Sequence, residues 1–273
     1  MIKMEIATVE HIGGREEQQD SVATFSSGDV HLLVVADGMG GHKGGRFASK
    51  IVINAAQQIW NKSQKDEKVT QPGQFLQDIC ELAHTQIHQF GKQHQLSPRS
   101  TCVLLYIDGN QAWWAYVGDS RLYHFNRKKL LSRTKDHSIV QLLVDLERIS
   151  EDDMATHPDQ GRLLKGLGGY EPIKPDFGQA TLHARDSLLL CSDGFWEQVS
   201  PPKMLKTLLK TDYSLKTRAK ALVKEALEAG GINGDNIAVA VAQLPADKSY
   251  NLLIYMILAI ITLLVGTGLW YFL

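Results

Sequence analysis

The feature that most constrains the fold of this chain is an apolar segment that ends abruptly at a carboxylate. Residues 30–36 are mainly apolar and β-branched, and Asp37 follows them directly, ahead of the glycine-rich residues 38–41. This pattern predicts a buried strand whose last residue delivers a carboxylate to the edge of a sheet. The glycines that follow would let a ligand approach the backbone closely. We therefore expect chemistry at this edge.

Glycines after a strand are also typical of nucleotide-binding loops, but two features argue against such a site. Asp37 would place a negative charge beside a pyrophosphate, which these loops meet with backbone amides. In the phosphate-loop reading, Arg46 and Phe47 stand where a lysine and a hydroxyl residue are required. A third interpretation makes Asp37 a metal ligand, and a simple turn after a strand remains the alternative.

Other carboxylates stand at the ends of predicted strands, as a metal site requires. Asp119 follows a strand at residues 112–117, Asp193 follows one at residues 187–191, and Asp235 precedes one at residues 237–242. Converging carboxylates repel one another, and an oxygen-preferring dication such as Mg²⁺ or Mn²⁺ would relieve that repulsion. No group of histidine and cysteine residues has the spacing of zinc ligands. Periodicity alone does not show whether these carboxylates lie close together in the fold.

The remaining periodicity predicts several helices and strands around this edge. Helical spacing of apolar residues indicates helices at residues 45–61, 74–94 and 215–229, and an edge strand is expected at residues 4–9. Asp108-Gly109 predicts a hairpin between strands at residues 101–107 and 112–117. Residues 147–170 are acidic and then glycine-rich, which is typical of a mobile excursion over a domain.

Charge and cysteine content limit the classes of partner. The 273 residues contain 29 Lys and Arg against 30 Asp and Glu, a net charge of -1, so no basic excess indicates nucleic-acid binding. The three cysteines lie in apolar segments and are expected to be reduced core residues in a cytosolic compartment.

The C-terminal residues have a different character from the rest of the chain. Residues 252–273 contain no charged side chain, and as a helix they would cover about 30 Å, one hydrocarbon thickness. We predict a transmembrane helix there, joined by a linker at residues 245–251 to a domain at residues 1–244. Residues 1–10 do not resemble a signal peptide, so a cytoplasmic domain on a single-pass anchor in the cell inner membrane or another membrane is expected.

Four short motifs, taken in order, resemble those of the metal-dependent type 2C serine/threonine protein phosphatases, particularly bacterial ones. They are Asp-Gly-Met-Gly-Gly-His at residues 37–42, Val-Gly-Asp-Ser-Arg at 117–121, Ser-Asp-Gly at 192–194 and Asp-Asn at 235–236. The resemblance covers roughly residues 6–244. It implies an α+β fold, a four-layer α/β/β/α sandwich of two antiparallel sheets flanked by helices, with the metals in a cleft at one end.

The resemblance also implies roles for individual residues. Asp37 would bridge two Mn²⁺ or Mg²⁺ ions, and the Gly38 carbonyl would bind one of them. Asp193 and Asp235 would hold the other. Arg15 matches the arginine that grips the substrate phosphate, and Asp20 would orient a metal-activated water. The implied catalytic residues are Arg15, Asp37 and Asp193, and the implied metal ligands, including those of a third ion at Asp119 and Asp193, are Asp20, Asp37, Gly38, Asp119, Asp193 and Asp235.

The implied reaction is the hydrolysis of phosphoserine and phosphothreonine in proteins, with a membrane-proximal serine/threonine kinase as one candidate partner. The alternative is a catalytically inactive module of the same fold that binds phosphoproteins. Gln18 stands where the family usually has asparagine, and residues 161–168 match the family's variable flap only loosely. The sequence therefore leaves the substrate preference open, and it does not indicate an oligomeric state.

Overall fold

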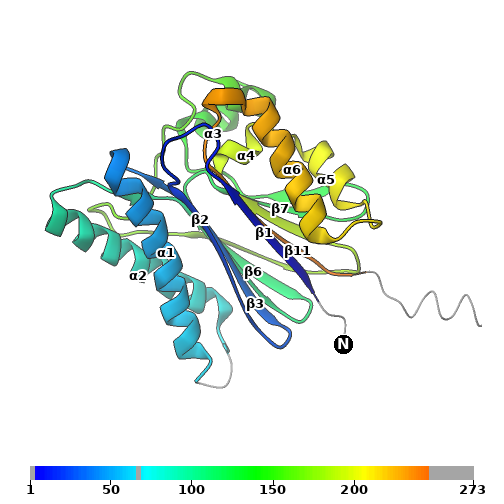
Figure 1. The fold of residues 1–273 in the computed structure, drawn as a ribbon. Coiled ribbons are helices and arrows are strands. Elements are labelled where there is room, and N and C mark those ends of the chain that lie inside the picture. The colour runs from blue at the N-terminus through cyan, green and yellow to red at the C-terminus, as the bar shows by residue number, and fades with distance from the viewer. Residues whose placement is uncertain (1–3, 66–68, 246–273) are drawn as a thin grey trace, which may run out of the picture.

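Two antiparallel sheets packed face to face form the centre of the molecule (Figure 1). The computed structural model describes residues 4–65 and 69–245. Within these ranges a five-stranded sheet has the order β1-β11-β10-β7-β8, and a six-stranded sheet has the order β2-β3-β5-β6-β9, with β4 also paired to β3. The strands are β1 Glu5–His11, β2 Asp20–Ser27, β3 Val30–Met39, β4 Arg99–Ser100, β5 Cys102–Asp108, β6 Gln111–Val117, β7 Arg121–Phe125, β8 Leu130–Arg133, β9 Asp176–Thr181, β10 Ser187–Cys191 and β11 Ile237–Gln243.

Helices cover both outer faces of this pair of sheets. Figure 1 shows α1 and α2 on one side of the strands and α5 and α6 on the other. The helices are α1 Gly41–Ser63, α2 Pro72–His94, α3 Ile139–Asp145, α4 Asp193–Trp196, α5 Pro201–Leu208 and α6 Leu215–Gly230, with short 3₁₀ turns η1 Glu151–Thr156 and η2 Gly231–Asn233. The predicted α+β sandwich of two antiparallel sheets flanked by helices is confirmed.

Alternation along the strands explains the layers. Successive side chains of a strand point to opposite faces, and in β3 Leu32 and Val34 pack in the core shared with α1 and α2, whereas Leu33 and Val35 pack in the core between the sheets. In the same way β11 divides its residues between the central core and the core beneath α5 and α6. Burial on both faces makes these central strands almost continuously apolar, which is why they were recognisable in the sequence.

The helices predicted from periodicity are present, with shifted ends. The first begins at Gly41, four residues before the predicted start, and α2 and α6 differ from prediction by one or two residues at their ends. Pro72 opens α2, where its missing N–H is no loss, and Gln95 ends it in the left-handed conformation at φ 54°.

Three details differ from the sequence prediction. The strand expected at residues 101–107 is β5, one residue later along the chain, and the short strand β4, just before it, was not anticipated. Within residues 147–170 the turn η1 was not anticipated, and β9 was missed just after them. The sequence of β9, Asp-Phe-Gly-Gln-Ala-Thr, is mostly polar because this strand lies at the exposed edge of its sheet.

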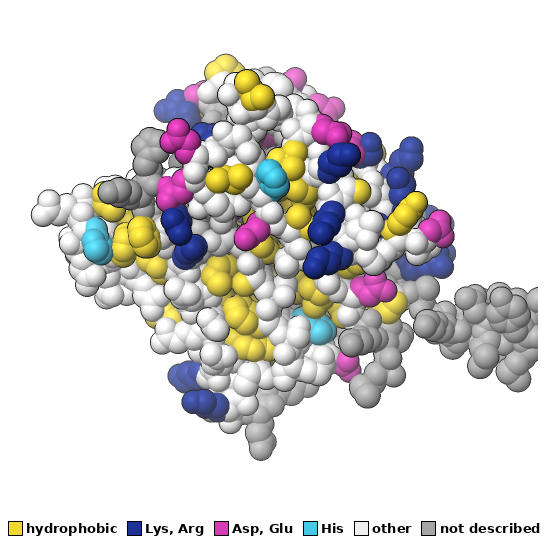
Figure 2. All heavy atoms as spheres, in the orientation of Figure 1, with side chains coloured by type: hydrophobic (Ala, Val, Ile, Leu, Met, Phe, Trp, Pro, Cys, Tyr) yellow, Lys and Arg dark blue, Asp and Glu magenta, His cyan; other side chains and the backbone are white. Residues whose placement is uncertain are grey.

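The predicted membrane segment lies outside the described residues, as does all of its linker except Pro245. Among residues 4–65 and 69–245, no helix has the length and apolar character needed to cross a membrane. The three cysteines, Cys80, Cys102 and Cys191, are buried free thiols as expected. On the face drawn in Figure 2, acidic and basic side chains are intermingled, in keeping with the near-zero net charge.

A buried ion pair joins β7 to the segment that follows β8. Arg121 Nη2 lies 2.7 Å from Asp136 Oδ2, and Arg121 Nε donates to both oxygens of the same carboxylate at 2.9 and 3.1 Å. The two side chains are only 8% and 1% exposed. The Arg121 guanidinium also lies over the Trp196 ring, 3.4 Å from its centroid. This pair therefore ties the start of β7, two residues after Asp119, to the segment that follows β8.

Removing one partner of this pair should destabilise the fold strongly. In Asp136→Ala the guanidinium of Arg121 stays buried without its carboxylate, and we expect a loss of about 3–5 kcal/mol in the free energy of unfolding. Asp145→Ala is the matched control, since its pair with Lys135 is exposed and should contribute less than about 1 kcal/mol. Urea unfolding followed by circular dichroism measures both, and equal losses in the two variants would contradict the expectation.

Candidate active site

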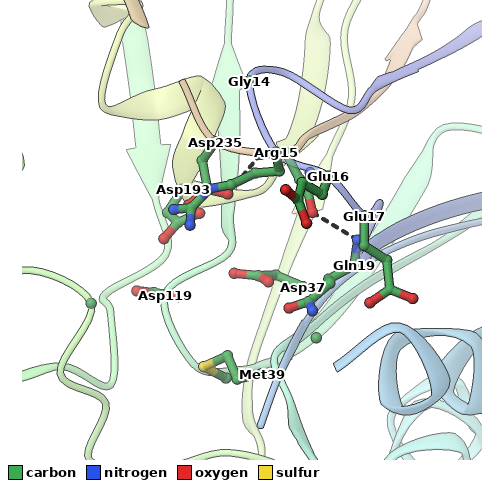
Figure 3. Close-up of a pocket in the computed structure, with 13 residues that line it drawn as sticks. Gly14, Arg15, Glu16, Glu17, Gln19, Asp37, Met39, Asp119, Asp193 and Asp235 are labelled. Atoms are coloured by element: carbon green, nitrogen blue, oxygen red, sulfur yellow. Dashed lines mark hydrogen bonds and ion pairs between the residues drawn. The ribbon is translucent and has the colours of Figure 1, made fainter. Parts of the chain in front are cut away.

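An acidic cleft lies at one end of the sandwich, where strands from both sheets terminate (Figure 3). Its volume is about 550 Å³. The residues that line it are Gly14, Arg15, Glu16, Glu17, Gln19, Asp37, Gly38, Met39, Asp119, Gly161, Asp193, Asp235 and Asn236. Six of the seven site residues predicted from the sequence are in this set, and Asp20 lies directly behind it.

Strand pairing brings the first two carboxylates together. Asp20 is the first residue of β2, and Asp37, near the end of β3, is its antiparallel partner. The Asp37 backbone is fixed from the other side, because its N–H donates to Thr101 Oγ1 at 2.9 Å and its carbonyl accepts from Thr101 N at 2.8 Å. The position of Asp37 is therefore set by three neighbouring strands.

The turn that connects the two sheets and a strand end of the other sheet supply the carboxylates that face Asp37. Asp119 follows β6 in the turn before β7, and Asp193 follows β10 as the first residue of α4. One oxygen from each of Asp37, Asp119 and Asp193 lies within 4.8 Å of the other two. Figure 3 shows these side chains pointing toward a shared space. Residues far apart in the sequence thus converge, as the metal-ligand interpretation required.

This cluster has the chemistry of a site for hard divalent cations. Its donors are carboxylate oxygens only, which suits Mg²⁺ and Mn²⁺ and not zinc. None of the three carboxylates forms an ion pair with a lysine or arginine among the described residues. Three close negative charges without a counter-ion are unfavourable, so the residues present fit a bound dication.

The protonation of the cluster reflects this crowding. Loss of hydration and repulsion from Asp193 and Asp235 raise the pKa of Asp20 to about 8, although Ser192 opposes the rise by donating to its Oδ2 at 2.6 Å. Burial and then the neighbouring aspartates raise the pKa of Asp37 well above its usual range. Burial and the Asp235 charge raise the pKa of Asp193 to about 6. The cation-free cleft therefore retains protons that ordinary aspartates lose.

Asp235 and Arg15 form a pair at the edge of the cleft. Arg15 Nη2 donates to Asp235 Oδ2 at 2.8 Å, and the two side chains are 56% and 38% exposed. Asp119 completes the closest group of carboxylate oxygens, and Asp235 lines the same cleft in contact with Arg15. That Asp235 shares a metal with Asp193 stays a prediction. The guanidinium predicted to grip phosphate is thus beside the carboxylates and open to solvent.

Gly38 lies where the backbone of β3 meets the start of α1. A Cβ atom at Gly38 would lie 1.9 Å from the Gly45 carbonyl oxygen, and one at Gly45 would lie 2.4 Å from the Gly38 carbonyl oxygen. Any side chain at either position would displace the helix from the strand. These glycines therefore let the start of α1 pack directly against β3 at Gly38, which lines the cleft.

Several supporting residues were present in the recognised motifs but had been given no role. Ser192 donates its hydroxyl to Asp20 and accepts from Ala238 N at 2.9 Å, so it links Asp20 to β11. Asn236 accepts from Gln19 N and donates to the Ile12 carbonyl, both at 2.7 Å. These side chains hold the segment that carries Arg15 against the end of β11.

Two further residues, on α4 and just after it, were missed because no short-range signal identifies them. Trp196 donates its indole N–H to the Asp119 carbonyl at 3.0 Å and carries Arg121 on its ring face, so it positions the Asp119 turn. Glu197 is half-buried, and desolvation followed by the charges of Asp193 and Asp235 raises its pKa to about 8. Only the folded chain brings these groups beside the cluster.

An oxygen-only cation site beside an exposed arginine, at the end of a two-sheet sandwich, defines the class of metal-dependent phosphoesterases. Residues 9–229 match the family described as Protein phosphatase 2C. The chain therefore belongs to the protein phosphatase 2C family.

Individual relatives agree with this assignment. Protein phosphatase PhpP of Streptococcus pneumoniae is 30% identical over 249 residues, which cover 90% of this chain and all of that protein. The chain is also similar to the Streptococcus agalactiae serine/threonine phosphatase structure, with a TM-score of 0.78, 28% identity and coverage of 89% of this chain and 100% of the other. The catalytic domain of PstP, solved with two manganese ions, matches with a TM-score of 0.75, 29% identity and coverage of 89% and 98%.

The raised pKa values predict an unusual pH dependence for the cation-free protein. Between pH 4 and about 8 the folded chain holds protons on Asp20 and its neighbours that the unfolded chain has released, so the free energy of unfolding falls as the pH rises. Each carboxyl that titrates in this window adds a slope of up to about 1.4 kcal/mol per pH unit. We expect Mn²⁺ to raise the melting temperature more at pH 8 than at pH 5.

Comparison with Asp37→Asn isolates the cluster in this experiment. Partly buried histidines titrate in the same window, in the opposite direction, in both proteins. The variant removes one carboxylate, so without cations its melting temperature should exceed that of the wild type by more at pH 8 than at pH 5. Its response to Mn²⁺ should also be weaker. If the difference in melting temperature between the variant and the wild type did not depend on pH, repulsion among the carboxylates would not explain the pH dependence.

Proposed function

We propose that this chain hydrolyses phosphoserine and phosphothreonine in proteins, with Mn²⁺ or Mg²⁺ bound in the acidic cleft. The observation that carries the proposal is the convergence of Asp37, Asp119 and Asp193 without a basic partner, next to an exposed arginine. Family membership supports the same reaction, and relatives are named as serine/threonine phosphatases. The manganese-bound PstP structure supports the choice of ion.

The proposal assigns the cleft residues as follows. Asp37 and the Gly38 carbonyl would hold a first ion, and Asp37, Asp193 and Asp235 would hold a second. Asp119 and Asp193 would provide a third, weaker site. When bound, such ions lower the pKa of water and counter the charge on phosphoryl oxygens. The proximity of the three carboxylate oxygens supports this assignment.

Arg15 and Asp20 have complementary parts in the proposal. The Arg15 guanidinium is planar and more than half exposed, so it can bind two phosphoryl oxygens at once and orient the phosphate toward the carboxylates. Asp20 is held by Ser192 and paired in register with Asp37, so its carboxyl can accept a hydrogen bond from a water in the cleft. Neither step requires a covalent phosphoenzyme.

Substitution of the central carboxylates tests the proposal directly. With Mn²⁺ present, Asp37→Asn and Asp193→Asn should lower kcat on an aryl phosphate and on a phosphothreonine peptide by about a hundredfold or more, because each removes a charged oxygen donor. Asp145→Asn makes the same change at an exposed position on α3 and serves as the control. Wild-type rates in both cleft variants would overturn the proposal. Binding of Mn²⁺ and peptide without hydrolysis by the wild type would instead support the inactive phosphoprotein-binding module.

We also propose that residues 252–273 anchor the catalytic domain, residues 1–244, to a membrane with the domain on the cytoplasmic side. The support is the run of 22 residues without a charged side chain, which lies outside the described part of the chain. A linker of about seven residues reaches at most about 25 Å, which favours membrane-proximal phosphoproteins, including a serine/threonine kinase, as substrates.

Cell fractionation tests the anchor separately from the chemistry. The full-length chain should sediment with membranes and resist carbonate extraction, because burial of a continuous apolar helix is effectively irreversible. A chain truncated after Pro245 should remain in the supernatant and keep its phosphatase activity. Recovery of the full-length chain in the supernatant would contradict the anchor without affecting the proposed reaction.

A further inference from the structure

A second cavity in the molecule is lined by basic groups and no acidic ones. It has a volume of about 260 Å³ and lies between the C-terminal end of α2, the strand β4 and residues 168–170. His88, Lys92 and Arg99 line it together with Tyr170, and we call it the basic pocket. None of these three basic side chains is ion-paired to a carboxylate in the described part of the chain. The pocket therefore has uncompensated positive charge.

The wall of the basic pocket is fixed by hydrogen bonds to Gly168. Arg99 Nη1 donates to the Gly168 carbonyl, and the Gly168 N–H donates to His84 Nδ1 at 3.2 Å. Gly168 has a φ of 90°, and a Cβ there would lie 2.3 Å from Ile87 Cγ2, so only glycine fits. One end of the Arg99 guanidinium is thus held in place, and its Nε and Nη2 make no hydrogen bond to another described residue.

The electrostatic influence of these groups extends to a neighbour. Burial and then the nearby His88 and Arg99 lower the pKa of His84. A bound anion would offset the same positive potential, and an arginine with free N–H groups on one edge has the geometry to bind a carboxylate or a phosphate. The basic pocket therefore favours an anionic ligand.

Strand pairing connects the basic pocket to the acidic cleft. Arg99 in β4 is the antiparallel partner of Met39 in β3, and side chains of directly paired residues lie on the same face of a sheet about 5 Å apart. Met39 lines the acidic cleft, and Figure 3 shows it beside the carboxylates, two residues after Asp37. Ser100 next to Arg99 also donates its hydroxyl to the Asp37 carbonyl at 3.0 Å. The pocket and the cleft are therefore neighbours on one surface.

We propose that the basic pocket binds an anionic side chain of the substrate, a carboxylate or a second phosphate, about two or three residues from the phosphorylated serine or threonine. Met39 is two residues, about 7 Å, along β3 from Asp37, and Arg99 lies about 5 Å across from Met39, so an extended peptide at about 3.3 Å per residue covers this interval in two or three residues. The inference rests on the proposed phosphatase function and adds a substrate class to it, namely acidic or multiply phosphorylated segments.

Matched peptides test the basic pocket with the full-length chain and Mn²⁺. One phosphothreonine peptide carries alanine two and three residues to either side, a second carries glutamate at these positions, and a third carries there a non-hydrolysable phosphonate analogue of phosphoserine. We expect kcat/KM to be about fivefold higher for the two anionic peptides, because each gains a charge-assisted contact in a partly exposed site. Glutamate and phosphonate peptides separate the carboxylate and phosphate forms of the ligand.

Charge reversal at the pocket supplies the control. In Lys92→Glu and Arg99→Met the ratio of anionic to neutral kcat/KM should fall to about one or below, whereas Lys220→Glu on α6 should keep the wild-type ratio. Lys220 is exposed on the opposite helical layer and receives the same charge change as Lys92. The proposed role of the basic pocket would be overturned if the ratio of anionic to neutral kcat/KM were one in the wild type. It would also be overturned if this ratio were unchanged in both pocket variants.

A binding measurement separates this inference from the proposed function. The same three peptides with phosphothreonine replaced by a phosphonate can be bound but not hydrolysed, and fluorescence anisotropy gives their affinities. Suppose that the wild type fails to hydrolyse an aryl phosphate and still binds the anionic peptides more tightly than the neutral one. That result would reject the proposed phosphatase function and support the proposed role of the basic pocket. Equal affinities for anionic and neutral peptides would reject the pocket whatever the activity.

Discussion

Repulsion among aspartates at the end of the sandwich is the constraint on which the rest of this structure depends. Asp37, Asp119 and Asp193 bring oxygens within 4.8 Å of one another, with Asp20 behind them. Bringing these charges together without an ion is unfavourable. Burial, and then the charges of the neighbouring aspartates, raise the pKa values of Asp20 and Asp193 to about 8 and 6. The fold must supply enough stability elsewhere to hold a site that becomes favourable only with cations.

The framework that supports this cleft is made of backbone pairing and polar anchors at the strand ends. Three apolar cores, one between the sheets and one under each helical layer, fix the strands. At their ends Thr101 holds Asp37, Ser192 holds Asp20, and Trp196 holds the turn of Asp119. Each anchor is itself hydrogen-bonded or packed, so the carboxylates cannot move apart to lower their repulsion. Such preorganisation at the cost of local stability is typical of catalytic sites.

Much of the fold could be predicted from the sequence, for identifiable reasons. Strands buried on both faces, such as β3, β10 and β11, are continuously apolar, and amphipathic helices such as α2 repeat apolar residues at helical spacing. The polar edge strand β9 has neither signal and was missed. The motifs also pointed to Asp235, which lines the cleft, but they gave no sign of its ion pair with Arg15.

The sequence by itself identified four of the aspartates that line the cleft, because Asp37, Asp119, Asp193 and Asp235 each stand in a short motif beside a predicted strand and can be recognised locally. Only the tertiary structure decided which of them meet. Convergence of Asp37 with Asp119 and Asp193 depends on the packing of two separate sheets, and the contact of Trp196 with the Asp119 turn spans 77 residues. The basic pocket likewise exists only because β4 pairs with β3 and places Arg99 beside Met39. Local propensity acts over a few residues, whereas these distances are set by the cores that hold the sheets and helices together.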